Sequence, residues 1–194
     1  TAKVQEKLTF CVYTGANCAA GGTALTLGNN GVLDEGVAYN NADAKFTVYT
    51  NAQGGVVVRA KTFAAPGHTL TSGTNSITSI GGSAAASAVG TEQYGMCIDM
   101  DGAGTVNAVA PYTGVEGGGG TCDEDLTTGA YTGTNTRFAF DTTATQTTFG
   151  DDVASSSAAS AATVGVLNFI ANISLTTEAG IYTNDVALIA TGTF

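Results

Sequence analysis

The first residues of the chain alternate between apolar and polar side chains. The apolar residues Val4, Leu8 and Phe10 fall on one side of a two-residue period, and the polar residues Lys3, Gln5 and Lys7 fall on the other. Only Glu6 breaks this pattern. Such alternation is typical of a half-buried β-strand. The sequence therefore predicts a strand at residues 3–13.

Similar patterns recur along the chain, and no long segment has the 3.6-residue period of a helix. Turn-forming sequences such as Asn29-Asn30-Gly31 separate them. The predicted strands are residues 3–13, 23–27, 44–50, 55–62, 76–80, 94–99, 137–140, 163–175 and 180–193. We therefore expect an all-β protein, an antiparallel β-sandwich of the jelly-roll or immunoglobulin-like type.

Two pairs of successive strands are predicted to form hairpins. In the first, Phe46 and Val48 alternate with more polar residues, and a Gly-rich turn leads into Val56 and its neighbours. In the second, the strand at 163–175 turns back into the strand at 180–193. Two segments rich in small residues are predicted to be connections, at 81–90 and 151–162.

The length of the chain favours one domain. At 19.2 kDa, folding buries about 70% of the extended surface, enough for one core. We predict an N-terminal strand at residues 1–13 and a single sandwich domain at 14–194. A long Gly-rich surface loop is expected at about 101–135, because the run Gly117 to Gly120 loses much backbone entropy when ordered.

The charge balance argues against some partners and favours a secreted protein. The chain has 6 Lys and Arg against 16 Asp and Glu, with a pI near 4.1, so it repels nucleic acid. Only 11% of residues are charged, and Thr, Ser, Asn and Gly replace the missing charge. No apolar run is long enough to span a membrane. Because the sequence begins with Thr1 rather than Met, we expect a chain processed by a signal peptidase and displayed outside the cell.

The cysteines predict disulfides. Cys11, Cys18, Cys97 and Cys122 show no C-x-x-C spacing, and the chain has a single His, so a zinc or redox site is not expected. Of the three possible pairings, Cys11 with Cys18 and Cys97 with Cys122 closes the smallest loops. We predict this pairing, which a chain-entropy estimate credits with about 2.5 and about 3.5 kcal/mol respectively.

Four acidic residues form a candidate calcium site. Asp99-Met100-Asp101-Gly102 resembles the start of a calcium-binding loop, but the alanines that follow exclude an EF-hand. If the second disulfide brings the segments together, Asp123 and Asp125 join Asp99 and Asp101 in a carboxylate cluster. The alternative is a set of solvated loop acids.

No motif for catalysis stands out, and we predict that the protein is not an enzyme. His68 follows Pro66-Gly67, which is a turn context typical of a surface residue. The sequon at Asn172 falls inside a predicted strand, so glycosylation there is not expected.

The last thirty residues suggest a family resemblance. The turn Ala179-Gly180-Ile181-Tyr182-Thr183, taken with an N-terminal strand that leads into Cys11, resembles secreted pilin-like β-sandwich proteins. The nearest comparisons are spore-coat-U-type and archaic chaperone-usher pilin domains, and more loosely camelysin-like fibre proteins. The resemblance implies a subunit that polymerises by donating its N-terminal strand to the next subunit.

Two uses of the N-terminal strand remain open on the sequence. The strand either folds into its own sheet or completes the sheet of a neighbour by β-augmentation through Val4, Leu8, Phe10 and Val12. Donation predicts a head-to-tail homopolymer, an extracellular filament or pilus. The alternative function is a monomeric cell-surface adhesin or carbohydrate-binding module that uses the Gly-rich loop.

Overall fold

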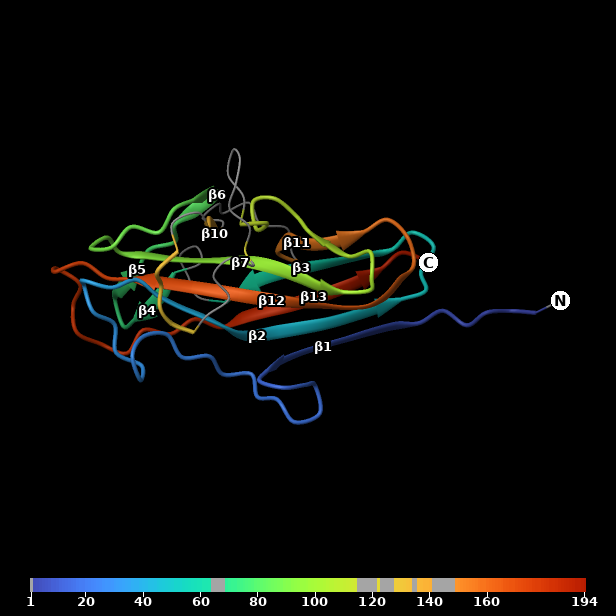
Figure 1. The fold of residues 1–194 in the computed structure, drawn as a ribbon, viewed down its shortest axis with the longest axis horizontal. Coiled ribbons are helices and arrows are strands. Elements are labelled where there is room, and N and C mark those ends of the chain that lie inside the picture. The colour runs from blue at the N-terminus through green and yellow to red at the C-terminus, as the bar shows by residue number, and fades with distance from the viewer. Residues whose placement is uncertain (1, 64–68, 115–121, 123–127, 134–135, 141–148) are drawn as a thin grey trace.

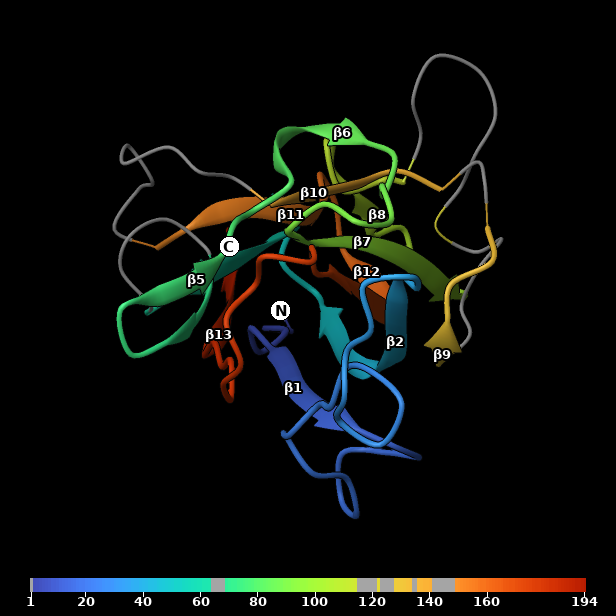
Figure 2. The ribbon, with the colours of Figure 1, turned by 90° about the vertical axis from the view of Figure 1, so that its left-hand side faces the viewer.

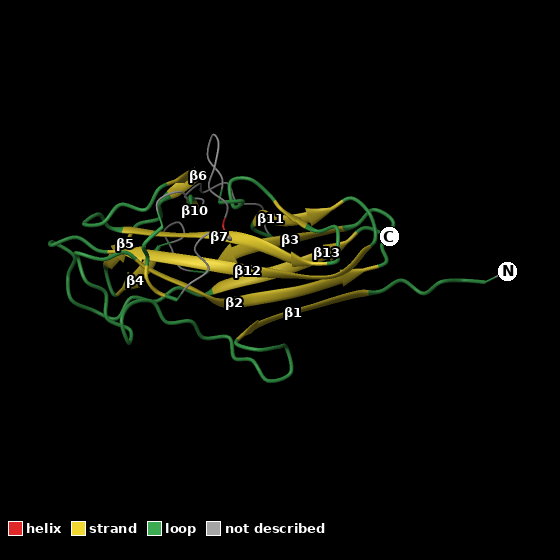
Figure 3. Cartoon of the chain, viewed as in Figure 1, coloured by secondary structure: helices red, strands yellow, loops and turns green. Residues whose placement is uncertain are grey.

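The fold is a sandwich of two antiparallel sheets. The structure is a computed structural model that describes residues 2–63, 69–114, 122, 128–133, 136–140 and 149–194. Apart from a short helical turn at Cys122, the elements assigned within these ranges are strands (Figures 1 and 3). The predicted all-β sandwich is confirmed.

The larger sheet has seven strands in the order β1-β2-β12-β7-β10-β6, with β9 paired to β2 on one side. Their bounds are β1 Leu8–Thr14, β2 Tyr39–Thr50, β12 Ser160–Asn172, β7 Gln93–Gly102, β10 Phe138–Phe140, β6 Gly81–Ala85 and β9 Gly129–Ala130. The long strands β2, β12 and β7 form its centre, where alternate side chains face the second sheet.

The smaller sheet has four strands in the order β13-β3-β11-β8. Their bounds are β13 Val186–Gly192, β3 Val56–Thr62, β11 Asp151–Ser156 and β8 Asn107–Ala108. A short separate pair, β4 Leu70–Ser72 and β5 Asn75–Ile77, lies at one end of the sandwich (Figure 1).

The core lies between the two sheets. Its largest fully buried side chains come from both layers and include Phe46, Val58, Met96, Phe140 and Val153. On β3 the side chains alternate between buried and half-buried positions, which is the pattern of a strand with one face on the core. Burial of these side chains supplies the main driving force for folding.

Both predicted hairpins are wrong, although all their strands exist. β2 belongs to the large sheet and β3 to the small sheet, and the same holds for β12 and β13. Each turn therefore crosses from one layer to the other. The physical reason is that Phe46 and Val48 on β2 face Val56 and Val58 on β3 across the core, where all four are buried.

The small-residue segments predicted as connections contain strands. β6 occupies half of one segment, and β11 with the start of β12 occupies most of the other. Conversely, residues 23–27 form no strand, although Leu25 and Leu27 pack against the core. A segment of small side chains shows no strong two-residue hydrophobic pattern. The secondary structure of these segments therefore depends on pairing with neighbouring strands more than on their own sequence.

The disulfides pair as predicted. Cys11 bonds to Cys18 with a Cα–Cα distance of 6.2 Å, and Cys97 bonds to Cys122 with a distance of 5.7 Å. The second bond lies in a small apolar cluster on the outer face of the large sheet, with Phe138 beside it. The Gly-rich loop is described only in part, and Gly117 to Gly120 lie outside the described residues, as does His68.

Candidate functional site

The N-terminal strand lies at the edge of the chain's own large sheet. β1 pairs antiparallel with β2, and Leu8 lies opposite Thr50. Leu8 and Phe10 pack against the core, and the ring centres of Phe10 and Phe46 are 5.9 Å apart. Val12 is 39% exposed. Within the single chain, these three predicted donor residues therefore belong to their own sheet, and their exchange between chains stays a prediction.

Residues 2–7 continue from β1 as an extended arm, which projects beyond the end of the sandwich (Figure 1). One asparagine holds the base of this arm. The Asn51 backbone N–H donates to the Lys7 carbonyl at 3.1 Å, and its side-chain amide donates to the Gln5 carbonyl at 2.7 Å. Val4, the fourth predicted donor residue, is 79% exposed. An apolar side chain this exposed on extended backbone is suited to pairing with another strand.

A second unpaired edge lies beside β1. Among the described strands, β13 pairs only with β3, and β1 pairs only with β2. The two edges approach each other on the same side of the sandwich (Figure 2). Val186, Leu188 and Ala190 on β13 are half-buried and pack against the core. This side of the molecule therefore presents two strand edges with apolar side chains beneath them.

The connection from β1 to β2 is long. Antiparallel neighbours can be joined by two residues, whereas residues 15–38 lie between these strands and contain no named strand. When fully extended, a segment of this length reaches about 80 Å. The Cys11–Cys18 disulfide ties β1 to the first part of this connection. The length of the connection allows β1 to leave its place without unfolding β2.

The candidate calcium site is described only in part. Asp99 and Asp101 lie at alternate positions of β7, opposite Val166 and Val164, so they share one face of the strand. Asp123 and Asp125 lie outside the described residues. Within the described ranges, no group of three or more His, Cys, Asp or Glu side chains could hold a metal ion. The four-residue site stays a prediction.

A surface hollow of about 270 Å³ is lined by Gly82 of β6, by the segment that follows β8, including Pro111 and Tyr112, and by Asp151 and Asp152 at the start of β11. The Tyr112 hydroxyl donates to Asp151 at 3.2 Å, and Arg59 forms an ion pair with Asp152 at 2.7 Å. Tyr112 is only 2% exposed, so its ring offers no open face for a sugar to stack on. The hollow therefore lacks the aromatic platform typical of carbohydrate sites.

The sequon asparagine is not available for modification. Asn172 is 1% exposed, and its side-chain amide donates to Ser87 Oγ at 2.7 Å and to the Ala88 carbonyl at 3.2 Å. Glycosylation requires an accessible nitrogen. The buried position agrees with the prediction that this sequon is unused.

Sequence reasoning missed two parts of this site. Asn51 follows β2 as a loop residue, and nothing in its sequence context marks it as the anchor of the arm. The sequence patterns predicted that β13 pairs with β12, so they did not predict a free edge on β13. Only the register of β13 with β3 leaves the other edge open.

None of the three comparisons, with protein-family models, with curated proteins and with solved structures, finds a match for this chain. In the part of the chain that the structure describes, no helix has the length and apolar character needed to cross a membrane.

Proposed function

We propose that this protein is a structural subunit of an extracellular filament, in which the N-terminal segment of one copy is donated to the sheet of the next. The observation that carries the proposal is the arm at residues 2–7. This arm is extended and exposed, and it projects beyond the end of the sandwich (Figure 1). The confirmed disulfides support a location outside the cytosol.

Strand donation is energetically reasonable for this arm. Burying Val4 in a neighbour's groove contributes about 1.5–3 kcal/mol before entropic costs. Main-chain hydrogen bonds to an open edge add to the affinity, and the same contact covers an edge that would otherwise favour aggregation. If β1 leaves its own sheet as well, Leu8 and Phe10 take part in the contact.

The direction of the arm favours an open polymer. It continues the line of β1 along the long axis of the sandwich (Figure 1). A contact between this arm and a different surface of the next copy is heterologous, and such contacts grow without closing unless the rotation between copies forms a ring. A filament is the expected product.

The alternative function has less support. A carbohydrate-binding module typically needs an exposed aromatic face on which a sugar can stack. The hollow beside Tyr112 offers no exposed aromatic face. We therefore put forward the filament subunit alone.

The test is deletion of residues 1–10, followed by electron microscopy and size-exclusion chromatography with light scattering. We expect the full chain to form filaments and the shortened chain to elute as a monomer. A thermal melt of the shortened chain establishes that it is folded. Filaments of unchanged length from the shortened chain, or a full chain that stays monomeric at every concentration, would overturn the proposal.

A further inference from the structure

The strand registers define two ends of the sandwich. Ser160 of β12 lies opposite Thr50 of β2 at the end where the arm leaves, and Ala171 lies opposite Tyr39 at the other end. We call this second end the far end, and Figure 2 shows the molecule from that side. Its surface is formed by the segments at residues 28–36, 86–92 and 173–182, which adjoin the ends of β2, β7 and β12 there.

The far end exposes large apolar side chains. Leu175 and Ile181 are each 85% exposed on the loop that follows β12. Val32, in the segment before β2, is 67% exposed, and Val89, in the segment before β7, is 55% exposed. Single exposed apolar residues are common on proteins, whereas several on adjoining loops mark an interaction surface.

Hydrogen bonds hold these loops in place. The Thr177 backbone N–H donates to the Ser174 carbonyl at 3.1 Å, which closes a turn around Leu175. The Thr177 hydroxyl donates to the Glu92 carboxylate at 2.6 Å, so the loop after β12 lies against the segment before β7. A surface that is already ordered loses less conformational entropy when a partner binds.

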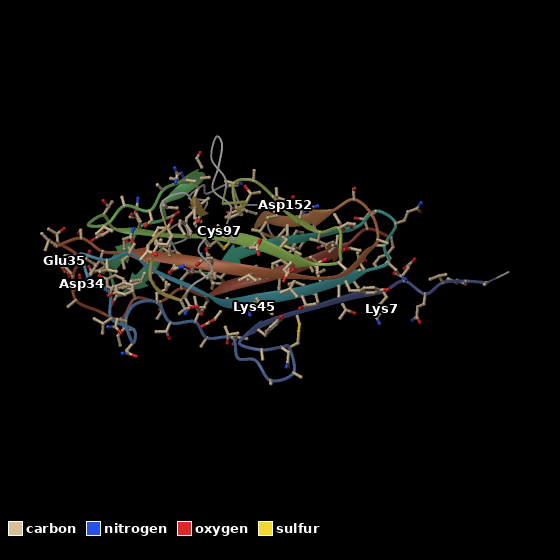
Figure 4. All side chains as sticks on the ribbon, viewed as in Figure 1. Lys7, Asp34, Glu35, Lys45, Cys97 and Asp152 are labelled. Atoms are coloured by element: carbon tan, nitrogen blue, oxygen red, sulfur yellow. A yellow bond between two sulfur atoms is a disulfide. The ribbon has the colours of Figure 1, made fainter. Side chains whose placement is uncertain are left out.

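The far end is also acidic. Its three segments carry the carboxylates of Asp34, Glu35, Glu92 and Glu178 and none of the six Lys and Arg residues of the chain. Figure 4 places Asp34 and Glu35 at the end of the molecule opposite Lys7. Glu178 accepts a hydrogen bond from the neutral amide of Asn75 at 2.6 Å. Within the described part of the chain, none of the four carboxylates forms an ion pair, so their charge is available to a cationic partner.

The chemistry of this surface limits what can bind it. Carboxylates repel anionic partners such as nucleic acid, acidic proteins and anionic lipid. Exposed apolar side chains favour a partner that buries apolar side chains of its own, because the hydrophobic effect drives such contacts. In protein interfaces, apolar contacts at the centre are combined with complementary charges that give specificity. The far end therefore fits a partner that is both cationic and apolar.

We propose that the far end is a docking surface for a basic segment of another protein, in which lysine or arginine side chains alternate with apolar ones. The apolar side chains of this segment cover Leu175 and Ile181, and its cationic groups pair with Glu92 and Glu178. The inference does not depend on the proposed filament, because a single chain presents the whole surface. In copies joined end to end, the surface is free on the last copy.

Binding of a synthetic peptide of alternating lysine and leucine tests the inference. Fluorescence anisotropy of the labelled peptide is measured at low salt, at concentrations of the full chain below those of self-association. We expect Glu92→Gln with Glu178→Gln, and separately Leu175→Ser with Ile181→Ser, to weaken binding about tenfold each. Glutamine keeps the hydrogen-bond acceptor of glutamate, so the first variant removes charge without releasing the loops.

Matched variants show whether the effect belongs to the far end. Asp43→Asn with Asp101→Asn removes the same charge from exposed positions within β2 and β7. Phe194→Ser removes a side chain that is 53% exposed at the end where the arm leaves. We expect both to leave peptide binding unchanged, and thermal melts establish that every variant is folded. An equal loss in these variants, or no loss in the far-end variants, would overturn the inference.

Hydrogen exchange and alternative probes identify the occupant. We expect the bound peptide to slow amide exchange in residues 86–92 and 173–182. Protection elsewhere, with none in these segments, would overturn the inference. A peptide of residues 1–7 that binds as tightly as the lysine–leucine peptide would mean that the occupant is a second copy. Binding of the chain to zwitterionic lipid vesicles, with no binding of the peptide, would mean that it is a membrane; either result overturns the proposed partner.

Discussion

Phe46 packs against a glycine in the neighbouring strand. Gly165 on β12 lies opposite Phe46 on β2, and a Cβ atom added to Gly165 would meet the Phe46 ring. The ring is fully buried and also contacts Phe10 of the N-terminal strand. The sequence indicates an apolar face on each of these strands, but not that one aromatic ring fills the space above a glycine, because that depends on register.

A larger residue at position 165 is expected to destabilise the sandwich. Gly165→Val forces the Phe46 ring out of its position, and overpacking of this kind costs about 1–3 kcal/mol. Thermal and urea unfolding measure the loss. The matched control is Ala162→Val on the exposed face of the same strand, which should change stability by no more than about 0.5 kcal/mol. Equal effects of the two substitutions would contradict this packing.

Tyr94 is the second residue with a clear physical consequence. It lies in the core, stacked on Phe169 with ring centres 5.9 Å apart, and burial raises the pKa of its hydroxyl far above the usual value. The folded chain therefore holds this proton more tightly than the unfolded chain. The contribution of Tyr94 to stability is complete below a pH of about 10 and is lost as the pH rises above it.

Tyr94→Phe should remove part of the alkaline loss of stability. We expect the melting temperature of the original chain to fall more steeply above pH 10 than that of the variant, since the variant has no proton to lose at this position. Melting curves collected between pH 7 and pH 11 measure the difference. Parallel pH profiles for the two chains would show that Tyr94 does not ionise in the unfolding transition.

At the scale of the elements, the sequence predicted the positions of strands well but not which strands pair with each other. The apolar patterns placed β3, β7 and β12 close to their observed bounds; β3 alternates between buried and half-buried positions, whereas β7 and β12 contain runs of consecutive buried residues. A two-residue period reports which side of a strand is buried but not which strand lies beside it. Both predicted hairpins are wrong for this reason, and with them the expected position of β13.

The sequence also predicted only part of the candidate site. The pattern correctly marks Leu8 and Phe10 as core-packed positions of an edge strand, but Val4 lies outside that strand and is exposed. It does not say that the strand begins at Leu8, because Asn51 fixes that boundary through hydrogen bonds from a distant loop. The disulfide pairing was predictable because short loops close at the lowest entropic cost.

The two disulfides are expected to contribute unequally to stability. Cys97→Ala with Cys122→Ala opens a loop with a sequence separation of 25 and should cost about 3.5 kcal/mol; Cys11→Ala with Cys18→Ala opens one of 7 and should cost about 2.5 kcal/mol. Cys97 and Cys122 also lie in the outer apolar cluster, so their loss removes packing as well. Urea unfolding of both double variants measures the order, and the reverse order would contradict this account.

At the scale of the whole molecule, the two ends of the sandwich differ in charge. An arm that carries Lys3 and Lys7 leaves one end, and Asp34 and Glu35 lie at the other (Figures 1 and 4). Unlike ends of this kind favour head-to-tail contacts over symmetric pairs. Because surface charges are screened within about 10 Å at 0.1 M salt, assembly should weaken as the ionic strength rises.

Hydrogen exchange of the assembled protein against the monomer tests the central claim most directly. The two forms are separated by size and compared segment by segment, with β6 at the opposite edge of the large sheet as the internal control. We expect the amides of residues 2–7 to exchange more slowly only in the assembled form, while those of β6 are unchanged. An arm that exchanges equally fast in both forms would contradict the claim that it joins one copy to the next.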